Sequence, residues 1–496
     1  MLKPRGPFHT PILPPAVIGW PEVAFHGDRC LWSKAEASDA LRTLRAARLY
    51  WPVPRHDAGQ ATTARITGPV NRLVLDTGAP LASIDPSALQ EIRAPEGHPA
   101  AAWGLLAGLS GDDARATTLL QHSRWRCPWR GGETDLASGL DALLFLHAAA
   151  SECRRPHATR GFSRWKCRAI TPFLTGPHGP PRHLKTGDPL PAGTIEIGWG
   201  TRPGATGWTA EDGFLRSVGL GVRNALPASL VIARGPLHYD ATGPNALDRL
   251  LADRPVPLHL IARARALRKS LLAGALTKYN QSSTAPPPRP VSGRPAILVP
   301  GQVEGDASLL RGSPAIRTNR ALLEAARARF PGAFLLYKPH PDVETGLRPG
   351  RIPESDLAVL ADRVTRDPSP LPAIAWCDRV ATMTSQLGFE ALIRAKPVTT
   401  FGRPFYAGWG LTDDLDPPDR SQRLTLDELV AASLIVYPRY IDPISRLPAP
   451  VEIAIDGLET LRTRQGRPLS RLVRLAGHAR SEILNAPEAP KWRPSR

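Results

Sequence analysis

Long apolar runs are missing from this sequence: no run approaches the roughly 18 residues that a membrane-spanning helix needs. The N-terminal stretch MLKPRGPFHTPILPP has no apolar region of the kind that secretory signals carry. The five cysteines are scattered and form no CxxC pair, a pattern that fits a reducing compartment. These absences predict a cytoplasmic protein.

Cofactor signatures are missing as well. No GxGxxG sequence and no Walker loop occurs, which disfavours binding of NAD or of ATP in a P-loop. No cluster of His and Cys has the spacing of metal ligands, so neither a metal nor another cofactor is expected. The sequence also carries no zinc-finger or groove-reading motif, and nucleic acid is therefore not expected as a partner.

The charge is strongly basic: 63 lysines and arginines outnumber 45 aspartates and glutamates, for a net charge of +18. Such a surplus suits an anionic partner, which could be nucleic acid, an anionic membrane face, or a phosphorylated or acidic substrate. The alternative is a composition that reflects an arginine-rich genome. Basic faces could also bring the protein to the inner face of the cytoplasmic membrane as a peripheral protein.

The length of 496 residues allows about two or three domains. In the N-terminal part, residues 33–51 have helical spacing behind a serine that could cap a helix, and residues 71–78 are typical of a strand. From about residue 160, short strands alternate with helices. We therefore predict five segments: an N-terminal segment (1–120), a first Rossmann-like unit (121–285), a Pro-rich linker (286–295), a second Rossmann-like unit (296–445), and a basic helix with a tail (446–496).

The second unit shows the clearest alternation of strand, loop and helix. Apolar strands run into polar loops in AILVPGQVEGD (296–306) and AFLLYKPHPD (333–342). RVATMTSQLGFEALIRAKPVTTFG (379–402) has the pattern of a strand, a loop, a helix and a strand. This order predicts an α/β fold with a parallel sheet. With a comparable unit before the linker, the prediction is two Rossmann-like domains that face each other across a cleft.

Polar loops follow three strands of the second unit, at the edge where ligands bind in parallel α/β sheets. Hydroxyl groups and backbone N–H groups at a helix N-terminus form a phosphate site, and nearby His and Lys side chains add donors. The alternatives are a helix cap, a loop histidine and solvated acids. The residues concerned are Gln302, Glu304 and Asp306 in the first loop, Lys338, His340 and Asp342 in the second, and Thr384 and Ser385 in the third.

In the first unit, TAEDGFLRSVGLG (209–221) places Glu211 and Asp212 beside a glycine just after an expected strand, with Arg216 close behind. These two acids could belong to a turn. They could also bring a carboxylate into the cleft opposite Asp306. Two carboxyl groups that flank a glycosidic carbon are the arrangement of retaining sugar chemistry, with one group as nucleophile and the other as acid/base.

FGRPFYAGWGLTDD (401–414) is too rich in glycine and proline for a regular helix or strand. It is also too aromatic for a flexible linker. The stretch therefore predicts a rigid loop bent by its glycines.

Seven motifs occur in the same order as in a known family. They are GFSRWK (161–166), EDGFLRSVGLG (211–221), LHYDAT (237–242), PGQVEGDAS (300–308), YKPHPDV (337–343), TSQLGFEAL (384–392) and GRPFYAGWGLTDD (402–414). In these motifs the sequence resembles the bacterial capsule polysaccharide biosynthesis proteins of the KpsC group, which are retaining β-Kdo glycosyltransferases. The resemblance covers about residues 120–445, and RLTLDELVAASLIVYPRYIDP (423–443) fits it too.

The resemblance implies a GT-B-like pair of Rossmann-type domains that transfers Kdo from CMP-β-Kdo, with retention, to an anionic glycolipid at the inner membrane, with capsule assembly proteins as further partners. The first unit would be the acceptor side, and the second would bind the CMP-sugar donor. Asp306 would be the nucleophile and Glu211 or Asp212 the acid/base, while the loop 401–414 would lie at the rim of the donor site and exclude water. The residues implied in binding CMP-Kdo are Gln302, Lys338, His340, Pro341, Thr384, Ser385, Glu390 and Arg216.

The resemblance has one departure. Full-length members of the family carry two catalytic units in tandem, whereas this sequence has one set of motifs. Residues 1–120 lack the motifs and could be a reduced remnant of a first unit or an unrelated addition. One type of linkage is therefore expected rather than two. The alternative function is a non-catalytic capsule-assembly or export protein that retains the fold.

Overall fold

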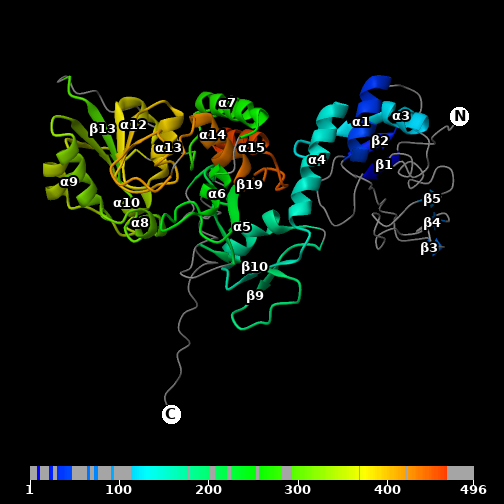
Figure 1. The fold of residues 1–496 in the computed structure, drawn as a ribbon, viewed down its shortest axis with the longest axis horizontal. Coiled ribbons are helices and arrows are strands. Elements are labelled where there is room, and N and C mark those ends of the chain that lie inside the picture. The colour runs from blue at the N-terminus through cyan, green and yellow to red at the C-terminus, as the bar shows by residue number, and fades with distance from the viewer. Residues whose placement is uncertain are drawn as a thin grey trace, which may run out of the picture.

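A computed structural model of the chain shows three bodies in a row, with the N-terminal segment at one end and the second Rossmann-like unit at the other (Figure 1). The first Rossmann-like unit lies between them. The structure describes residues 8–11, 22–25, 31–46, 64–67, 72–75, 91–93, 113–176, 178–200, 207–219, 225–252, 256–280, 293–367, 369–420 and 422–465.

The second unit is built on a six-stranded sheet in which each strand is parallel to its neighbours. The order is β15-β14-β13-β16-β17-β18, so the chain starts in the middle of the sheet and extends it on both sides. The strands are β13 (Ala296–Pro300), β14 (Phe334–Lys338), β15 (Arg363–Val364), β16 (Arg379–Thr382), β17 (Val398–Thr400) and β18 (Asp413–Asp414). The helices are α8 (Ala307–Gly312), α9 (Asn319–Arg329), α10 (Pro341–Glu344), α11 (Glu354–Leu360), α12 (Leu371–Trp376) and α13 (Gln386–Ile393). The α/β fold predicted from the sequence is confirmed.

Local sequence explains the elements of this unit. The central strands β13 and β14 are buried along their whole length, as in parallel sheets that are covered on both faces. Helix α9 begins where the Thr318 side chain accepts a hydrogen bond from the N–H of Ala321. Leu322 and Leu323 of α9 are then buried against the sheet, which holds the loop after β13 in place.

The first unit contains a six-stranded mixed sheet in the order β19-β12-β11-β10-β8-β9. The strands β9, β8, β10 and β11 are parallel, whereas β12 and β19 pair in antiparallel fashion. The elements are β8 (His157–Arg160), α5 (Arg164–Leu174), β9 (Arg182–Leu184), β10 (Ile195–Trp199), β11 (Trp208–Asp212), β12 (Ser229–Arg234), α6 (Ala246–Ala252) and β19 (Pro438–Tyr440). Because β19 follows the whole second unit, the chain returns to the first unit before it ends.

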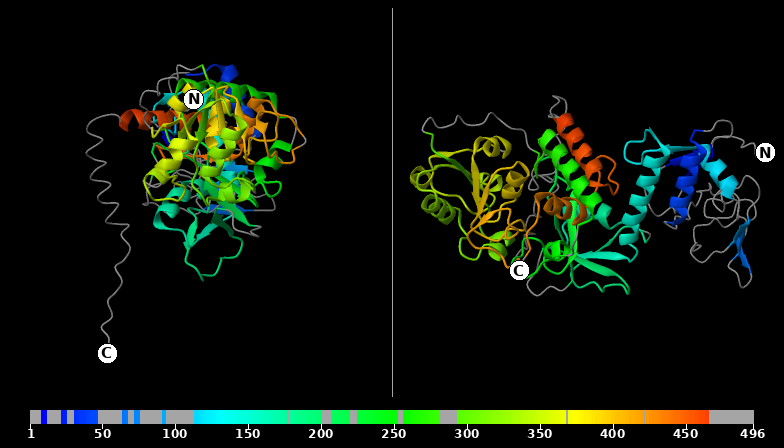
Figure 2. Two further views of the ribbon diagram at one scale, coloured as in Figure 1. Left: turned by 90° about the vertical axis from the view of Figure 1, so that its left-hand side faces the viewer. Right: turned by 45° about the horizontal axis from the view of Figure 1, so that its top comes forward.

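Helices α7 (Leu258–Ala273) and α15 (Val451–Gln465) lie side by side on the first unit (Figure 2). Arg263 on α7 donates hydrogen bonds of 2.7 and 2.8 Å to the carboxylate of Glu452 on α15. Helix α14 (Leu426–Val430) starts with a capping box between Thr425 and Glu428 and continues as the π-helix η3 (Ala431–Val436). The helix expected within residues 446–496 is α15, whereas the tail after it lies outside the described residues.

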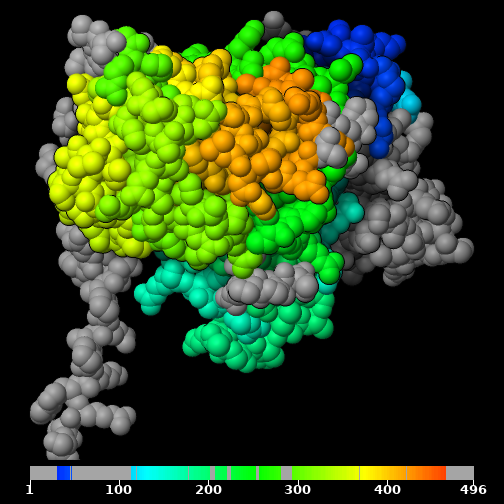
Figure 3. Space-filling model, turned by 60° about the vertical axis from the view of Figure 1, so that its left-hand side comes forward, coloured from blue at the N-terminus to red at the C-terminus, as the bar shows by residue number. Residues whose placement is uncertain are grey.

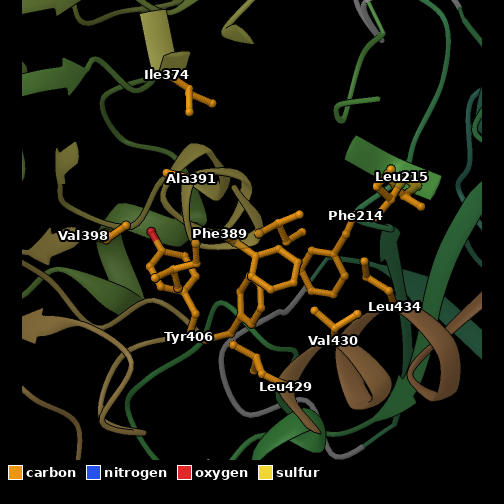
Figure 4. Close-up of a cluster of buried hydrophobic side chains, with 14 of the residues drawn as sticks. Phe214, Leu215, Ile374, Phe389, Ala391, Val398, Tyr406, Leu429, Val430 and Leu434 are labelled. Carbon is orange, nitrogen blue, oxygen red and sulfur yellow. The ribbon is translucent and has the colours of Figure 1, made fainter. Parts of the chain in front are cut away.

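A buried aromatic cluster joins the two units (Figure 4). Phe214 follows β11 in the first unit, and Phe389 lies on α13 in the second. Phe405, from the loop 401–414, packs against both, with ring centroids 4.6 and 5.0 Å away. Tyr406 of the same loop is fully buried and donates a hydrogen bond of 2.6 Å to the carbonyl oxygen of Ser385. In the space-filling view, the orange segment after β17 lies against both units (Figure 3).

Most of the loop 401–414 is therefore buried in the core, whereas the resemblance implied that it lies at the rim of the donor site. Phe405, Tyr406 and Trp409 are all buried, and only Pro404 and Phe405 of this loop reach the cleft between the units. Glycines are needed where the loop turns, because Gly408 and Gly410 have φ angles of +77° and +78°.

The N-terminal body packs around a small apolar core. It contains α1 (Lys34–Ala46), α3 (Asp113–Gln121), the start of α4 (Leu136–Glu152) and a sheet of β1 (Phe8–Pro11), β2 (Glu22–Phe25), β6 (Ser123–Arg126) and β7 (Glu133–Thr134). A further small sheet holds β3 (Ala64–Thr67), β4 (Arg72–Leu75) and β5 (Glu91–Arg93). Ser33 caps α1, since it exchanges hydrogen bonds with Glu36. Residue 120, where the sequence suggested a boundary, lies inside this core, because Leu120 and Trp125 are both buried in it.

The turn before β7 attaches this body to the first unit. Trp129 donates a hydrogen bond of 2.9 Å to the carbonyl oxygen of Pro448. Arg130 donates to the buried carboxylate of Asp442 at 3.0 Å and also pairs with Asp456 at 2.6 Å. The N-terminal body is thus anchored to the segment that follows β19.

Candidate active site

The two units enclose a cavity of about 390 Å³, a size that suits a small-molecule ligand. From the first unit it is lined by residues at the end of β11, by the His238–Tyr239 pair and by the crossover segment 277–279. From the second unit it is lined by the loops after β13, β14 and β16. The three polar loops predicted from the sequence are therefore brought together, as expected for adjacent parallel strands.

His340 is held as a neutral imidazole. It caps α10, and its Nδ1 accepts a hydrogen bond of 3.1 Å from the N–H of Asp342, which leaves the proton on Nε2. Burial is the main reason that the pKa of His340 is lowered to about 4, and the charges of Lys278 and Lys338 act in the same direction. At neutral pH this ring is therefore an uncharged donor. Its neighbour Pro341 also lines the cavity.

The N-terminus of α13 points into the cavity. Ser385 is its cap, with the hydroxyl accepting from the N–H of Leu387 at 3.2 Å, and Gln386 also lines the cavity. Thr384 is occupied by Gln302: its N–H donates to Gln302 Oε1 at 2.9 Å, and its hydroxyl accepts from Gln302 Nε2 at 2.9 Å. Gln302 and Thr384 thus lock two loops together. The N–H of Ser385 donates to the Thr382 hydroxyl at 3.3 Å, so the N–H of Gln386 is the donor left at the start of the helix to receive an anion.

Lys338 and Glu390 are buried and partly committed to the protein itself. The Lys338 amine donates a hydrogen bond of 2.7 Å to the carbonyl oxygen of Asp367, and burial lowers its pKa. Glu390 accepts a hydrogen bond of 2.8 Å from the backbone N–H of Lys278, and burial raises its pKa. Both side chains line the cavity. They shape its electrostatics from the second unit.

Asp306 and Glu304 have different environments. The Asp306 carboxylate is exposed, lines the cavity and accepts a hydrogen bond of 3.2 Å from the hydroxyl of Ser308. Glu304 is directed to α9, where Glu304 Oε1 accepts from the N–H of Asn319 at 2.8 Å. Of these two acids, Asp306 is the one that faces the cleft.

Across the cavity, Glu211 and Asp212 are the last two residues of β11 rather than part of a turn. Asp212 accepts a hydrogen bond of 2.5 Å from Arg216, whose side chain is almost fully buried. Burial is the main cause that raises the pKa of Glu211 to about 7, and the charges of Asp212 and Asp306 add to the rise. The resemblance implied that Arg216 binds CMP-Kdo, but Arg216 does not line the cavity. Its side chain instead binds the carboxylate of Asp212.

Sequence reasoning missed several lining residues. His238 and Tyr239 come from the loop after β12, Lys278 and Tyr279 follow α7, and Arg348 follows α10. The LHYDAT motif contained His238 and Tyr239, so the resemblance offered a signal for them. For Lys278 no local signal exists, because it lies in the segment that follows helix α7 and not after a strand.

Two further observations concern the part of the chain that the structure describes. No group of three or more His, Cys, Asp or Glu side chains there is arranged to hold a metal ion. No helix among these residues combines the length and the apolar character needed to cross a membrane.

Two Rossmann-type units that face each other across a cleft, with polar loops at the ends of parallel strands, define a GT-B-like fold. The model of the family described as "Capsule polysaccharide biosynthesis protein" matches residues 280–440. A solved Thermosulfurimonas dismutans KpsC structure, described as a beta Kdo 2,7 transferase, is 33% identical; the match covers 62% of this chain and 99% of that one, with a TM-score of 0.51. A second KpsC structure from that organism, a beta Kdo 2,4 transferase, is 33% identical over 62% of this chain and 98% of that one, with a TM-score of 0.53. This chain belongs to the KpsC-type capsule polysaccharide biosynthesis family, which confirms the resemblance in the motifs.

Curated relatives extend beyond the matched region. The capsule polysaccharide modification protein LipA of Neisseria meningitidis is 38% identical over 347 residues, which are 66% of this chain and 49% of LipA. The lipopolysaccharide-processing protein LpsZ of Rhizobium meliloti is 44% identical over 237 residues, which are 47% of this chain and 54% of LpsZ. The chain spans about half the length of the curated relatives it matches.

Proposed function

We propose that this protein is a retaining β-Kdo glycosyltransferase, which moves Kdo from CMP-β-Kdo onto a Kdo-containing glycolipid in capsule polysaccharide biosynthesis. One observation carries the proposal: Glu211 and Asp306, from opposite units, face one cavity that is also lined by the N-terminus of helix α13. Two carboxylates and an anion site are the parts that a double displacement from a nucleotide sugar needs.

In the first step, the Asp306 carboxylate attacks the anomeric carbon of the donor. A carbon–oxygen bond to Asp306 forms, the bond to the phosphate oxygen breaks, and CMP leaves with the electron pair. The leaving phosphate would be received by the N–H group of Gln386 at the start of α13 and by the Nε2–H of His340. Donors aimed at the developing charge lower the barrier, since they are already oriented before the reaction.

In the second step, Glu211 acts as the general base. It takes the proton of the acceptor hydroxyl, the hydroxyl oxygen attacks the anomeric carbon, and the bond to Asp306 breaks. Two inversions give net retention. A pKa of about 7 matches this task at neutral pH, whereas Asp212 is committed to Arg216. These environments support Glu211 over Asp212 as the base.

The acceptor would be an anionic glycolipid at the inner face of the cytoplasmic membrane, reached by peripheral contact. The net charge of +18 supports an anionic donor and an anionic acceptor. The CMP-sugar is a substrate, and no cofactor enters the proposed reaction.

The test is a transfer assay with the purified protein. CMP-Kdo is generated in situ and offered with a lipid acceptor that ends in β-Kdo, and the products are analysed by mass spectrometry and NMR. One added Kdo in β linkage supports the proposal. If the protein binds CMP but adds no Kdo to any Kdo-terminated acceptor, the non-catalytic alternative holds instead.

A further inference from the structure

Lys278 brings a positive charge into the cavity, where its amine also lies over the ring of Tyr279, 5.5 Å from the ring centroid. It lies in the crossover segment 276–280, between α7 and the linker to the second unit, and its side chain lines the cavity. Burial lowers the pKa of the Lys278 amine, but Tyr279 and the carboxylates of Asp212 and Glu211 outweigh this and raise the pKa above its ordinary value. The amine is therefore a cation at neutral pH.

The carboxylates near Lys278 also interact with groups other than its amine. Among them Asp212 acts most strongly on the amine, but Asp212 is already paired with Arg216 at 2.5 Å. Glu211 has a pKa of about 7, so it carries a full negative charge only above neutral pH. Glu390 uses an oxygen to accept the backbone N–H of Lys278, and it lies beside Arg394. The amine thus remains able to attract the negative charge of a ligand.

The backbone of Lys278 is held by both units. Its N–H donates to Glu390 of α13 at 2.8 Å. Its carbonyl oxygen accepts from the N–H groups of Arg216 and Ser217 of the first unit, at 3.1 and 3.2 Å. Because the backbone is fixed from two sides, the side chain starts from a defined point at the junction. Preorganisation of this kind lowers the entropy lost when a ligand binds.

Lys278 lines the same cavity as the proposed nucleophile Asp306 and the proposed base Glu211. Its charge acts on Glu211 and Asp212 of the first unit and on His340 of the second. Its charge therefore reaches groups of both units that line the cavity. A donor sugar that carries a carboxylate on its anomeric carbon would bring that negative charge close to Asp306 and Glu211. Without a nearby cation, this arrangement of like charges would oppose binding.

We propose that Lys278 binds the carboxylate on the anomeric carbon of the donor sugar and so selects 2-keto sugar acids over neutral sugars. The inference rests on the proposed function and names the residue that recognises the donor sugar. The phosphate of the nucleotide is left to the N-terminus of α13 and to His340. A charge-assisted hydrogen bond to a carboxylate gives the cation both affinity and selectivity.

The test compares the wild type with Lys278→Met, which keeps the length of the side chain and the backbone hydrogen bonds but removes the charge. The Michaelis constant for CMP-Kdo generated in situ is expected to rise roughly ten- to a hundred-fold. The affinity for CMP, measured by calorimetry, is expected to stay within about twofold of the wild type, since CMP lacks the sugar carboxylate. An equal loss for CMP would make Lys278 a phosphate ligand and overturn the inference, as would an unchanged Michaelis constant.

Two further variants serve as controls. Lys269→Met removes a charge from the exposed face of α7, away from the lining of the cavity, and is expected to leave both constants unchanged. Lys278→Arg retains the cation and is expected to recover most of the donor selectivity, even where Lys278→Met unfolds. If Lys278→Arg folds but loses donor and CMP affinity alike, the inference is wrong.

A second comparison uses the ligand instead of the protein. The wild type should bind a CMP-sugar acid more tightly than its analogue with the carboxylate reduced to an alcohol, and Lys278→Met should lose that preference. A preference that survives in Lys278→Met overturns the inference alone. A wild type that transfers no Kdo overturns the proposed function and this inference with it, so the two failures are distinguishable.

Discussion

Glu211 and Asp306 lie on opposite units of the protein and face the same cavity. Burial is the main cause that raises the pKa of Glu211 to about 7, and the negative charge of Asp306 is among the further causes. The two carboxylates thus interact electrostatically across the cleft. Their environments differ, since Glu211 lies at the end of a strand whereas Asp306 is exposed at the start of α8. Such a difference allows one group to act as a base and the other as a nucleophile.

Asp306→Asn keeps the shape of the side chain and removes the proposed nucleophile. Transfer is expected to fall by about a thousand-fold or more, while CMP binding persists in calorimetry. Wild-type protein incubated with CMP-Kdo and no acceptor should carry a Kdo adduct on the peptide that holds Asp306, detected by mass spectrometry.

Glu304→Gln is the matched control for this substitution, because Glu304 lies in the same loop but accepts a hydrogen bond from the N–H of Asn319 at the start of α9. A Gln oxygen can still accept this hydrogen bond, so the variant is expected to lose less than about 1 kcal/mol of stability and to leave the adduct in place. An adduct on another carboxylate, or near-normal transfer in Asp306→Asn, would contradict the assignment.

The rate should depend on pH through Glu211. Below pH 7 this carboxyl is protonated and cannot take the proton of the acceptor, so the rate should fall as the pH is lowered through about 7 and level off above it. Glu211→Gln should abolish this dependence and lower the rate by about a hundred-fold or more. The measurement is the transfer rate between pH 5 and 9 at saturating donor, with the pH chosen within the range in which the protein stays folded.

Asp212→Asn should behave differently. It leaves the buried Arg216 without its carboxylate, and breaking such a pair costs about 3 kcal/mol. We expect a lower melting temperature in a thermal scan. The pH–rate profile should keep its midpoint but shift it to lower pH, because the charge of Asp212 contributes to the raised pKa of Glu211. A profile that loses its midpoint in Asp212→Asn and keeps it in Glu211→Gln would reverse the two roles.

His340→Ala should weaken binding of CMP roughly ten- to a hundred-fold, because it removes a donor to a charged phosphate. His340→Asn is the informative companion, since an Asn oxygen can still accept the N–H of Asp342 and cap α10. If calorimetry shows the same loss for both variants, the Nε2–H of the ring is the feature that matters. Recovery of CMP binding in His340→Asn would reduce His340 to a helix cap.

Binding to anionic vesicles should weaken as salt is added, because charge attraction fades over a Debye length of about 8 Å at physiological ionic strength. The structure limits what α7 can contribute. Arg263 pairs with Glu452, and Arg265 and Arg268 both pair with Asp427. Co-sedimentation at low and high salt measures the effect. Binding that does not change with salt would indicate that the net charge of the chain reflects its composition alone.

Much of the second unit could be predicted because its signals are local. A run of buried apolar residues, a polar loop and a capped helix stand next to one another in the sequence, so the loops of Asp306, His340 and Ser385 were found. The antiparallel strand β19 was not found, since its partner β12 lies more than 200 residues earlier in the chain. Lys278 was missed for the same reason, because its neighbours Glu390 and Asp212 come from two other elements.

The aromatic loop shows another limit. Its glycines and aromatic side chains indicated rigidity, but the sequence alone does not distinguish a rim that excludes water from a core that joins two units. Burial of Tyr406 and its contact with Ser385 decide for the core. Within the loop 401–414, only Pro404 and Phe405, near its start, line the cavity between the units.

The return of the chain to the first unit constrains how the cleft can open. The backbone passes between the units once after Lys278 and again between β18 and α14, since Asp427 of α14 pairs with Arg265 of α7. Two bodies joined by one tether can swivel in any direction, whereas two tethers define a line about which they bend. Opening and closing of the cavity should therefore follow one dominant axis, with the buried ring of Phe405 near the pivot and the carboxylates of Glu211 and Asp306 on the moving faces.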